Sequence, residues 1–267
     1  MQLPITILPG DKRMEYTAES LEKRGGKMCS SLAGIPDSGY VVCGIPFTKD
    51  GIMVNITTPD PPSIRCFLGM LTSRHILIGG NLPKAVVTYC TNHGIKYYDV
   101  TASPSFVSKN ARLTAEGLLI PLLSHTSFSI CDCKTLLIGY GNCGREIADI
   151  LQLFTEELYI YDINSYTMKA AKSKHLKTIS EQEIQNLSPK LRHINTIINT
   201  SPVNPFHTRI WGSFPEDCTV FNIASFSLNV PLPISEQIIN CPGIPGKYAP
   251  KTAGNIIAKE ICEHFKL

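Results

Sequence analysis

The sequence predicts an α/β protein of two domains, each built on a parallel sheet. Short apolar runs alternate along the chain with longer segments of helical periodicity, which is the pattern of βαβ units. The chain has 267 residues, of which 43% are hydrophobic and 18% are charged. This is enough for two compact units of about 130 residues each. We therefore expect two cores, with no repeat and no disordered linker between them.

The first domain is expected to span residues 1–112. Its expected strands are Ile5–Leu8, Tyr40–Gly44, Ile52–Ile56, His75–Ile78 and Lys96–Val100. Helical patterns lie between several of these strands, at Glu15–Arg24 and at Lys84–Asn92, and Pro83 suits the first turn of the second helix. The sequence Lys49-Asp50-Gly51 predicts a hairpin turn between two short strands.

The second domain is expected to span residues 113–267 and to open with an interdomain helix at 114–127. Thr114 is a suitable N-cap for this helix, leucines recur after it at helical spacing, and Pro121 favours a bend. The elements expected after it are strand Lys134–Ile138, helix Arg145–Phe154, strand Leu158–Tyr161, helices Tyr166–Lys174 and Glu181–Leu191, strands Thr196–Asn199, Thr219–Ile223 and Ile238–Cys241, and a C-terminal helix at Thr252–Phe265.

A glycine motif joins the first strand and the first helix that follow the interdomain helix. It reads Gly139-Tyr140-Gly141-Asn142-Cys143-Gly144, which is the G-x-G-x-x-G spacing of a dinucleotide-binding turn. The first glycine suits a tight turn, the second lets the backbone approach a pyrophosphate, and the third lets the helix pack closely on its strand. Because strand, turn and helix are in the required order, we expect these six residues to bind a dinucleotide on a Rossmann doubly wound sheet.

Asp162 ends the next strand, 18 residues beyond the last glycine. A carboxylate at this position accepts hydrogen bonds from a ribose 2′-OH and repels a 2′-phosphate, so the sequence favours NAD over NADP as the cofactor. Small side chains also follow later strands, where open α/β sheets bind their ligands. The residues Thr200, Ser201, Ala224 and Ser225 are therefore candidates for the nicotinamide ribose, and ordinary loop polarity explains them equally well.

Composition excludes several other classes of protein. The net charge of +3 is too weak and dispersed for a nucleic-acid partner, and no apolar run approaches the ~20 residues of a membrane span. The first ten residues lack the regions of a signal peptide, so a cytoplasmic protein is expected. The 10 cysteines are scattered without metal-ligand spacing, which favours reduced thiols and no metal site.

Several stretches resemble one family. Residues 110–117 (Asn-Ala-Arg-Leu-Thr-Ala-Glu-Gly), the glycine motif, residues 242–246 (Pro-Gly-Ile-Pro-Gly) and residues 249–254 (Ala-Pro-Lys-Thr-Ala-Gly) are similar in order and spacing to the A subunits of dipicolinate synthases. The resemblance covers most of residues 110–267. It thins toward the N-terminus, where residues 8–13 look like the family's opening segment.

The resemblance implies an N-terminal flavodoxin-like domain and a Rossmann domain, as in the D-2-hydroxyacid dehydrogenases, with the last helix packing back toward the first domain. It implies an NAD(P)-dependent oxidoreductase subunit that forms dipicolinate from a dihydro- or tetrahydrodipicolinate intermediate of the lysine pathway during sporulation. It also implies that the partner is a flavoprotein-like second subunit. We further expect a homo-oligomer, with neither nucleic acid nor membrane as a partner.

A dicarboxylate substrate requires cationic partners, because a desolvated dianion is costly to bind otherwise. Residues 1–112 carry 12 Lys and Arg against 8 Asp and Glu, an excess that suits either solubility or an anion-binding wall. The candidate substrate-binding residues are Lys12, Arg13, Arg112 and Lys251. A solvated surface position is an equally good explanation for each of them.

No general base can be named from the sequence. His125 and His207 are the least unsuitable histidines, but no motif assigns a role to either. Cys143 at a helix start could have a lowered thiol pKa, but small-volume packing is the favoured explanation because hydride transfer needs no nucleophile. Two alternatives therefore stay open: a reductase or dehydrogenase of a small 2-hydroxy acid, and a non-catalytic nucleotide-binding assembly subunit.

Overall fold

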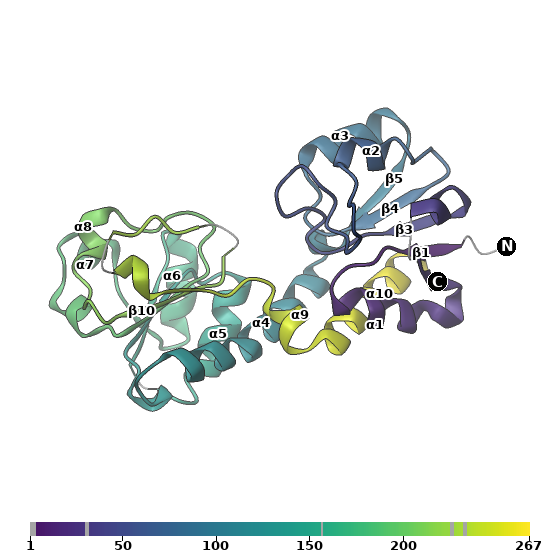
Figure 1. Ribbon diagram of the computed structural model, residues 1–267. Coiled ribbons are helices and arrows are strands. Elements are labelled where there is room, and N and C mark those ends of the chain that lie inside the picture. Colours follow the sequence, from purple (N-terminus) through teal and green to yellow (C-terminus); the bar gives the residue numbers. More distant parts are fainter. Residues whose placement is uncertain (1–3, 30–31, 156, 225–226, 232–233) are drawn as a thin grey trace. The chain divides into compact units, whose positions relative to one another are not determined.

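The chain folds into two compact units, each with a parallel sheet, which confirms the predicted fold class (Figure 1). The computed structural model describes residues 4–29, 32–155, 157–224, 227–231 and 234–267. Unit 1 consists of Met1–Asn110 together with Pro245–Leu267, and unit 2 consists of Ala111–Ile244. Both ends of the chain therefore contribute to unit 1.

The sheet of unit 1 has the strand order β2-β1-β3-β4-β5. Its strands are β1 Ile5–Ile7, β2 Gly26–Met28, β3 Tyr40–Val42, β4 Ile76–Gly79 and β5 Lys96–Asp99. The helices within residues 1–110 are α1 Lys12–Leu21, α2 Ile64–Leu68, α3 Lys84–Asn92 and the start of α4 Pro104–His125. This is the flavodoxin-like order, in which the chain changes direction across the sheet between β1 and β3. Buried apolar side chains cover both faces of the sheet.

The expected strand at Ile52–Ile56 and its hairpin are wrong. Met53 forms a single antiparallel bridge with Ser63, and no strand extends from it. The carboxylate of Asp50 accepts hydrogen bonds from the backbone N–H groups of Ile52 and Met53, both at 2.8 Å. Because Asp50 engages these two amides, they are not available for a strand ladder.

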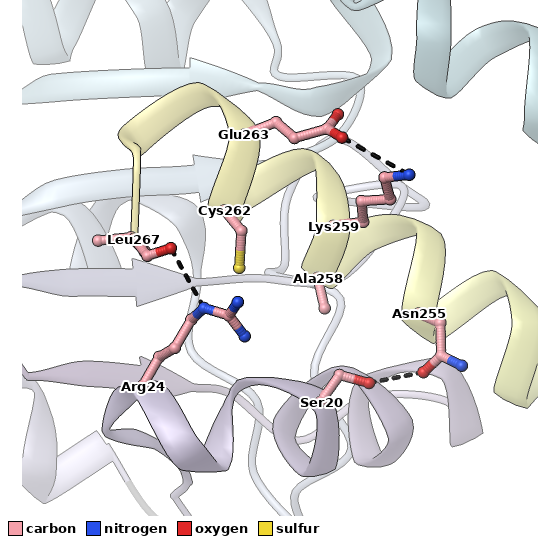
Figure 2. A pocket seen from close by; sticks show the side chains of 8 residues that line it. All are labelled: Ser20, Arg24, Asn255, Ala258, Lys259, Cys262, Glu263 and Leu267. Carbon is pink, nitrogen blue, oxygen red and sulfur yellow. Dashed lines mark hydrogen bonds and ion pairs between the residues drawn. The ribbon is translucent and has the colours of Figure 1, made fainter.

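The C-terminal helix α10, Pro250–Phe265, packs on α1 within unit 1. A Cβ atom on Gly254 would lie 2.5 Å from the carbonyl oxygen of Arg13, so only glycine allows the two helices to approach this closely. The hydroxyl of Thr17 donates to the Gly254 carbonyl at 3.2 Å. Ser20 and Asn255 continue the contact with a hydrogen bond of 2.6 Å (Figure 2). The short helix α9, Ile244–Tyr248, precedes α10.

The sheet of unit 2 has the strand order β11-β10-β9-β6-β7-β8. Its strands are β6 Thr135–Ile138, β7 Leu158–Tyr161, β8 Lys177–Thr178, β9 Thr196–Asn199, β10 Thr219–Asn222 and β11 Ile238–Asn240. Its helices are the remainder of α4, α5 Asn142–Leu151, α6 Ser165–Ser173, α7 Glu181–Gln185 and α8 Thr208–Trp211. Two buried apolar clusters cover the faces of this doubly wound sheet.

Two helices of unit 2 differ from the expectation. The expected helix at 114–127 is the second part of the 22-residue α4, and Pro121 lies inside it. The expected helix at Glu181–Leu191 ends at Gln185, since Leu187 has the left-handed φ of 51° and Pro189 disfavours helical backbone before it. The short 3-10 turns of the chain are η1 Glu22–Arg24, η2 Leu32–Asp37, η3 Val100–Ala102, η4 Ile130–Asp132, η5 Pro189–His193 and η6 Ile234–Gln237.

Within the described residues, no helix has both the length and the apolar character that a bilayer span requires. Burial raises the pKa of four cysteine thiols, those of Cys43, Cys90, Cys133 and Cys218. These four buried cysteines therefore pack as small neutral side chains.

Candidate functional site

The glycine turn between β6 and α5 has the geometry of a phosphate cradle. Gly139 has a φ of 90°, which strains any residue with a side chain. A Cβ atom on Gly144 would lie 2.0 Å from the carbonyl oxygen of Gly139, so the third glycine permits the close packing of helix on turn. A Cβ atom on Gly141 would meet nothing within 4 Å. The second glycine thus faces open space in which a side chain would obstruct an approaching ligand.

The first turn of α5 presents backbone donors next to this space. Helical hydrogen bonding starts with the Arg145 N–H, which donates to the Gly141 carbonyl at 3.0 Å. The N–H groups of Asn142, Cys143 and Gly144 precede it and so have no partner within the helix, and Gly141 supplies no capping side chain. Together with the positive end of the helix dipole, they suit a phosphate group.

Asp162 follows β7 and closes one side of the glycine turn. One carboxylate oxygen accepts the backbone N–H of Tyr140 at 2.7 Å, and the other accepts that of Asn164 at 2.8 Å. A carboxylate has about four acceptor positions, so two of them remain for a ligand hydroxyl. Asp162 therefore both holds the turn and offers acceptors beside it.

Two residues of the motif contribute their backbone and not their side chains. The ring of Tyr140 is buried in the core of unit 2, where burial raises the pKa of its hydroxyl. Within the described residues, that hydroxyl has no hydrogen-bond partner. Burial also raises the pKa of the Cys143 thiol, which is the reverse of activation. Cys143 is thus a neutral, partly buried thiol that packs against the same core.

The end of β9 lies beside the glycine turn. The Thr200 N–H donates to the carbonyl of Ile138 at 2.9 Å, and the Thr200 hydroxyl lies 3.0 Å from the same oxygen. The hydroxyl of Ser201 donates to the Val203 carbonyl at 3.0 Å. Ala224, just past β10, is partly exposed, and Ser225 lies outside the described residues. The hydroxyls of Thr200 and Ser201 are therefore engaged with backbone, and these assignments stay predictions.

Of the predicted substrate cations, Arg13 is the one held most tightly. Its side chain is 9% exposed and forms an ion pair of 2.6 Å with Asp11. It also donates to the Ile45 carbonyl at 2.6 Å, and a Cβ atom on Gly246 would lie 2.8 Å from its Nε. The guanidinium therefore joins the loops after β1 and β3 to the segment before α10, all within unit 1.

The other three predicted cations are exposed. Lys12 lies in the first turn of α1, and Lys251 in the first turn of α10. Arg112, in unit 2, bonds to Glu116 at 2.9 Å and lies 3.6 Å from Glu146. Arg112 is thus already compensated by two carboxylates, whereas Lys12 and Lys251 form no ion pair with any residue that the structure describes.

Sequence reasoning missed one further cation, Lys49. Burial on its own would raise the pKa of Asp11, but hydrogen bonds from Arg13 and the positive charges of Arg13 and Lys49 outweigh it and lower that pKa. Lys49 is exposed and lies in the loop after β3. The sequence alone does not predict that Lys49 lies near Asp11, because the strand order decides which loops are neighbours.

Neither of the two candidate histidines is assigned a role by its surroundings. His125 is exposed near the end of α4, with its Nδ1 3.1 Å from the Pro121 carbonyl oxygen. His207 is exposed immediately before α8.

Unit 1 also carries a groove of about 440 Å³ between α1 and α10, lined by Arg24, Lys259 and Glu263 among others (Figure 2). It contains none of the predicted site residues.

Known proteins resemble this chain in sequence and in fold. No family model matches the chain. The chain is 25% identical over 158 residues to the A subunit of dipicolinate synthase from Bacillus subtilis (strain 168). It is similar to that protein. The match covers 56% of this chain and spans about half the length of the relative, 50%.

Solved structures extend the similarity to the whole fold. The A subunit of dipicolinate synthase from Bacillus subtilis has a TM-score of 0.82 and 17% identity, covering 100% of this chain and 96% of that one. Its counterpart from Bacillus halodurans has a TM-score of 0.84 at 17% identity, with 100% and 99% covered. NAD⁺-bound 3-phosphoglycerate dehydrogenase from Entamoeba histolytica is more distant, with a TM-score of 0.58 and 12% identity over 100% of this chain and 96% of that one. The predicted resemblance to the A subunits of dipicolinate synthases is confirmed.

Proposed function

We propose that this chain is an NAD-dependent oxidoreductase subunit that forms dipicolinate from a dihydro- or tetrahydrodipicolinate intermediate of the lysine pathway. It would act in the cytoplasm during sporulation, together with a flavoprotein second subunit. The observation that carries the proposal is the glycine turn, with open space at Gly141, first-turn amides of α5 that have no helical partner, and the carboxylate of Asp162 beside it. The similarity to the A subunits of dipicolinate synthases supports the substrate class.

The residues present fit a dinucleotide. The first-turn amides of α5 would hold the pyrophosphate, and Asp162 would accept hydrogen bonds from the adenosine ribose. Ile163 and Tyr166 follow Asp162 and are 86% and 79% exposed, which provides apolar surface for an adenine ring. Asp162 would repel a 2′-phosphate, which favours NAD over NADP.

NAD, when bound, supplies a hydride acceptor. A dihydropyridine dicarboxylate that loses one hydride and one proton becomes the aromatic product, and a tetrahydro substrate needs one more two-electron oxidation. Aromatisation supplies driving force, so orientation of the substrate matters more than a strong base. We assign carboxylate binding first to Lys12 and Lys251, which have no carboxylate partner within the described residues. Arg13 and Arg112 are already paired and so rank below them.

The test combines the purified chain, NAD and dihydrodipicolinate, with and without the flavoprotein partner, and follows the absorbance of dipicolinate. Product formed with the pair, and lost in Lys251→Ala through a raised KM, supports the proposal. Lys259→Ala, on an exposed lysine of the same helix, is the matched control and should behave as the wild type. Turnover of a 2-hydroxy acid by the chain alone would support a reductase instead. Binding of NAD without any turnover would support a non-catalytic subunit.

A further inference from the structure

Three asparagines end three neighbouring strands of unit 2. Asn199, Asn222 and Asn240 are the last residues of β9, β10 and β11, and the parallel register pairs Asn222 with both of the others. Asn199 is 0% exposed and Asn222 2% exposed. A row of three carboxamides, two of them buried and Asn240 exposed, thus crosses the carboxyl edge of the sheet. We call these three residues the asparagine ladder.

The asparagine ladder is a directed chain of hydrogen bonds. Asn199 Nδ2 donates to Asn222 Oδ1 at 2.9 Å, and Asn222 Nδ2 donates to Asn240 Oδ1 at 3.1 Å. Asn199 also brackets Ser201, because its Oδ1 accepts the Ser201 N–H at 3.1 Å and its Nδ2 donates to the Ser201 carbonyl at 3.3 Å. Both donors and the acceptor of Asn199 are therefore used.

The turn that Asn199 brackets also packs on the glycine turn. Thr200 bonds to the end of β6 through its N–H, and a Cβ atom on Gly139 would lie 2.4 Å from the Thr200 hydroxyl oxygen. The contact thus runs from Asn240 through Asn222 and Asn199 to the first glycine of the motif. A shift of the ladder would first move the turn at Thr200 and Ser201, whereas the glycine turn keeps its own hydrogen bond to Asp162.

We propose that the asparagine ladder positions the nicotinamide half of the dinucleotide. The inference rests on the proposed function. In the strand order, Asp162 follows β7 on one side of β6, and the ladder lies across β9, β10 and β11 on the other side. A dinucleotide with its pyrophosphate at the β6–α5 turn spans both sides, so its second half lies over the strand ends that the ladder fixes.

The residue type supports a positioning role. A carboxamide is both donor and acceptor, so three in a row hold three strand ends at a set spacing, whereas apolar side chains would bury the same ends without directional bonds. Removing the middle amide leaves the Nδ2 of Asn199 with an unpaired proton in a buried place. The side chain of Asn199, and with it the backbone of Ser201 to which it bonds, is then free to shift.

The experiment measures the affinity of the full chain for NAD and for ADP-ribose, which lacks the nicotinamide ring. We expect Asn222→Ala to weaken NAD binding about tenfold while ADP-ribose affinity stays unchanged. The control is Asn195→Ala at the opposite end of β9, where Asn195 Oδ1 accepts the Lys134 N–H at 2.9 Å. This variant also loses a carboxamide hydrogen bond of unit 2, an exposed one away from the ladder, and should change neither affinity.

Each outcome separates the two claims. If the wild type binds neither compound, the proposed function fails. If the wild type binds both and Asn222→Ala weakens neither, or weakens both equally, the ladder has no selective role and the inference is overturned. If Asn222→Ala does not fold, Asn240→Ala at the exposed end of the ladder takes its place, with an expected loss of about threefold for NAD alone.

Discussion

The two units each contain a β–turn–α segment at the carboxyl edge of a parallel sheet, and the two turns are finished in opposite ways. In unit 1 the turn between β1 and α1 is closed by its own side chains. In unit 2 the turn between β6 and α5 is left open. The difference separates a helix start that supports the fold from one that is available to an external anion.

The closed turn satisfies its own donors. The carboxylate of Asp11 caps the Arg13 N–H at 3.0 Å and pairs with the Arg13 guanidinium, which in turn bonds to Ile45. A Cβ atom on Gly10 would meet the Met14 side chain at 2.7 Å. The open turn has glycine in place of the capping side chain and empty space at Gly141.

The largest expected effect comes from Gly144→Ala. Its Cβ atom would overlap a backbone carbonyl oxygen at 2.0 Å, so we expect a loss of about 3 kcal/mol or more of unfolding free energy and no dinucleotide binding. Gly10→Ala in unit 1 is the matched variant, because its Cβ atom would meet Cγ of the buried Met14 at 2.7 Å, a side-chain atom that can shift more easily than a backbone carbonyl, and should cost less, about 1–2 kcal/mol. Urea titrations measure the unfolding free energy of both variants, and an equal loss in the two would contradict the contrast between the two turns.

Arg13→Ala tests the closed turn. Breaking a buried pair costs about 3–5 kcal/mol, and we expect about 2 kcal/mol here because Asp11 is half exposed, with NAD affinity unchanged. Lys12→Ala, on the exposed neighbour, is the control and should change stability by less than about 0.5 kcal/mol.

The loss in Arg13→Ala should depend on pH. Arg13 lowers the pKa of Asp11 below its ordinary value of 3.8. A lowered folded-state pKa contributes stability that is complete above the unfolded-state pKa and disappears as the pH falls through the folded-state pKa. The difference between wild type and variant should therefore be largest near neutral pH and shrink below about pH 4. A difference that is constant from pH 7 to pH 2 would refute this account of the pair.

Asp162→Asn tests the open turn, and its expected effect is smaller than those of the preceding variants. Removing the negative charge should raise NADP affinity relative to NAD about tenfold, because the repulsion of a 2′-phosphate is relieved. Asp149→Asn, which removes an exposed carboxylate paired with Lys174 at 3.1 Å in the same unit, should leave the ratio unchanged. Fluorescence titration with NAD and with NADP measures this ratio of affinities. An unaltered ratio in Asp162→Asn would remove Asp162 from cofactor selection.

The open turn could be predicted from sequence because its signals are local. Three glycines at fixed spacing and an acidic residue 18 positions later are read along one strand–turn–helix unit. The closed turn carries a weaker local signal, an aspartate at an N-cap, which sequence reasoning did not use. The pairing of Arg13 with Ile45 joins residues 32 positions apart, and only the strand order brings them together.

The asparagine ladder shows why the rest of the site could not be predicted. Its members are separated by 23 and 18 residues along the chain, and each one alone is an ordinary strand-end asparagine. Only the parallel register of β9, β10 and β11 places the three carboxamides side by side. The very short strands β2 and β8, of 3 and 2 residues, were missed for a related reason, since pairing with a neighbour defines them more than their own composition does.

The most direct test of the central claim is a calorimetric titration of the wild type and of Gly141→Ala with NAD, accompanied by thermal unfolding of both. A Cβ atom at Gly141 touches nothing in the protein, so the unfolding temperature should stay unchanged. The same atom occupies the approach to the amides of α5, so NAD affinity should fall about a hundredfold. Absence of NAD binding by the wild type, or equal affinity in both proteins, would contradict the assignment of the open turn as a dinucleotide site.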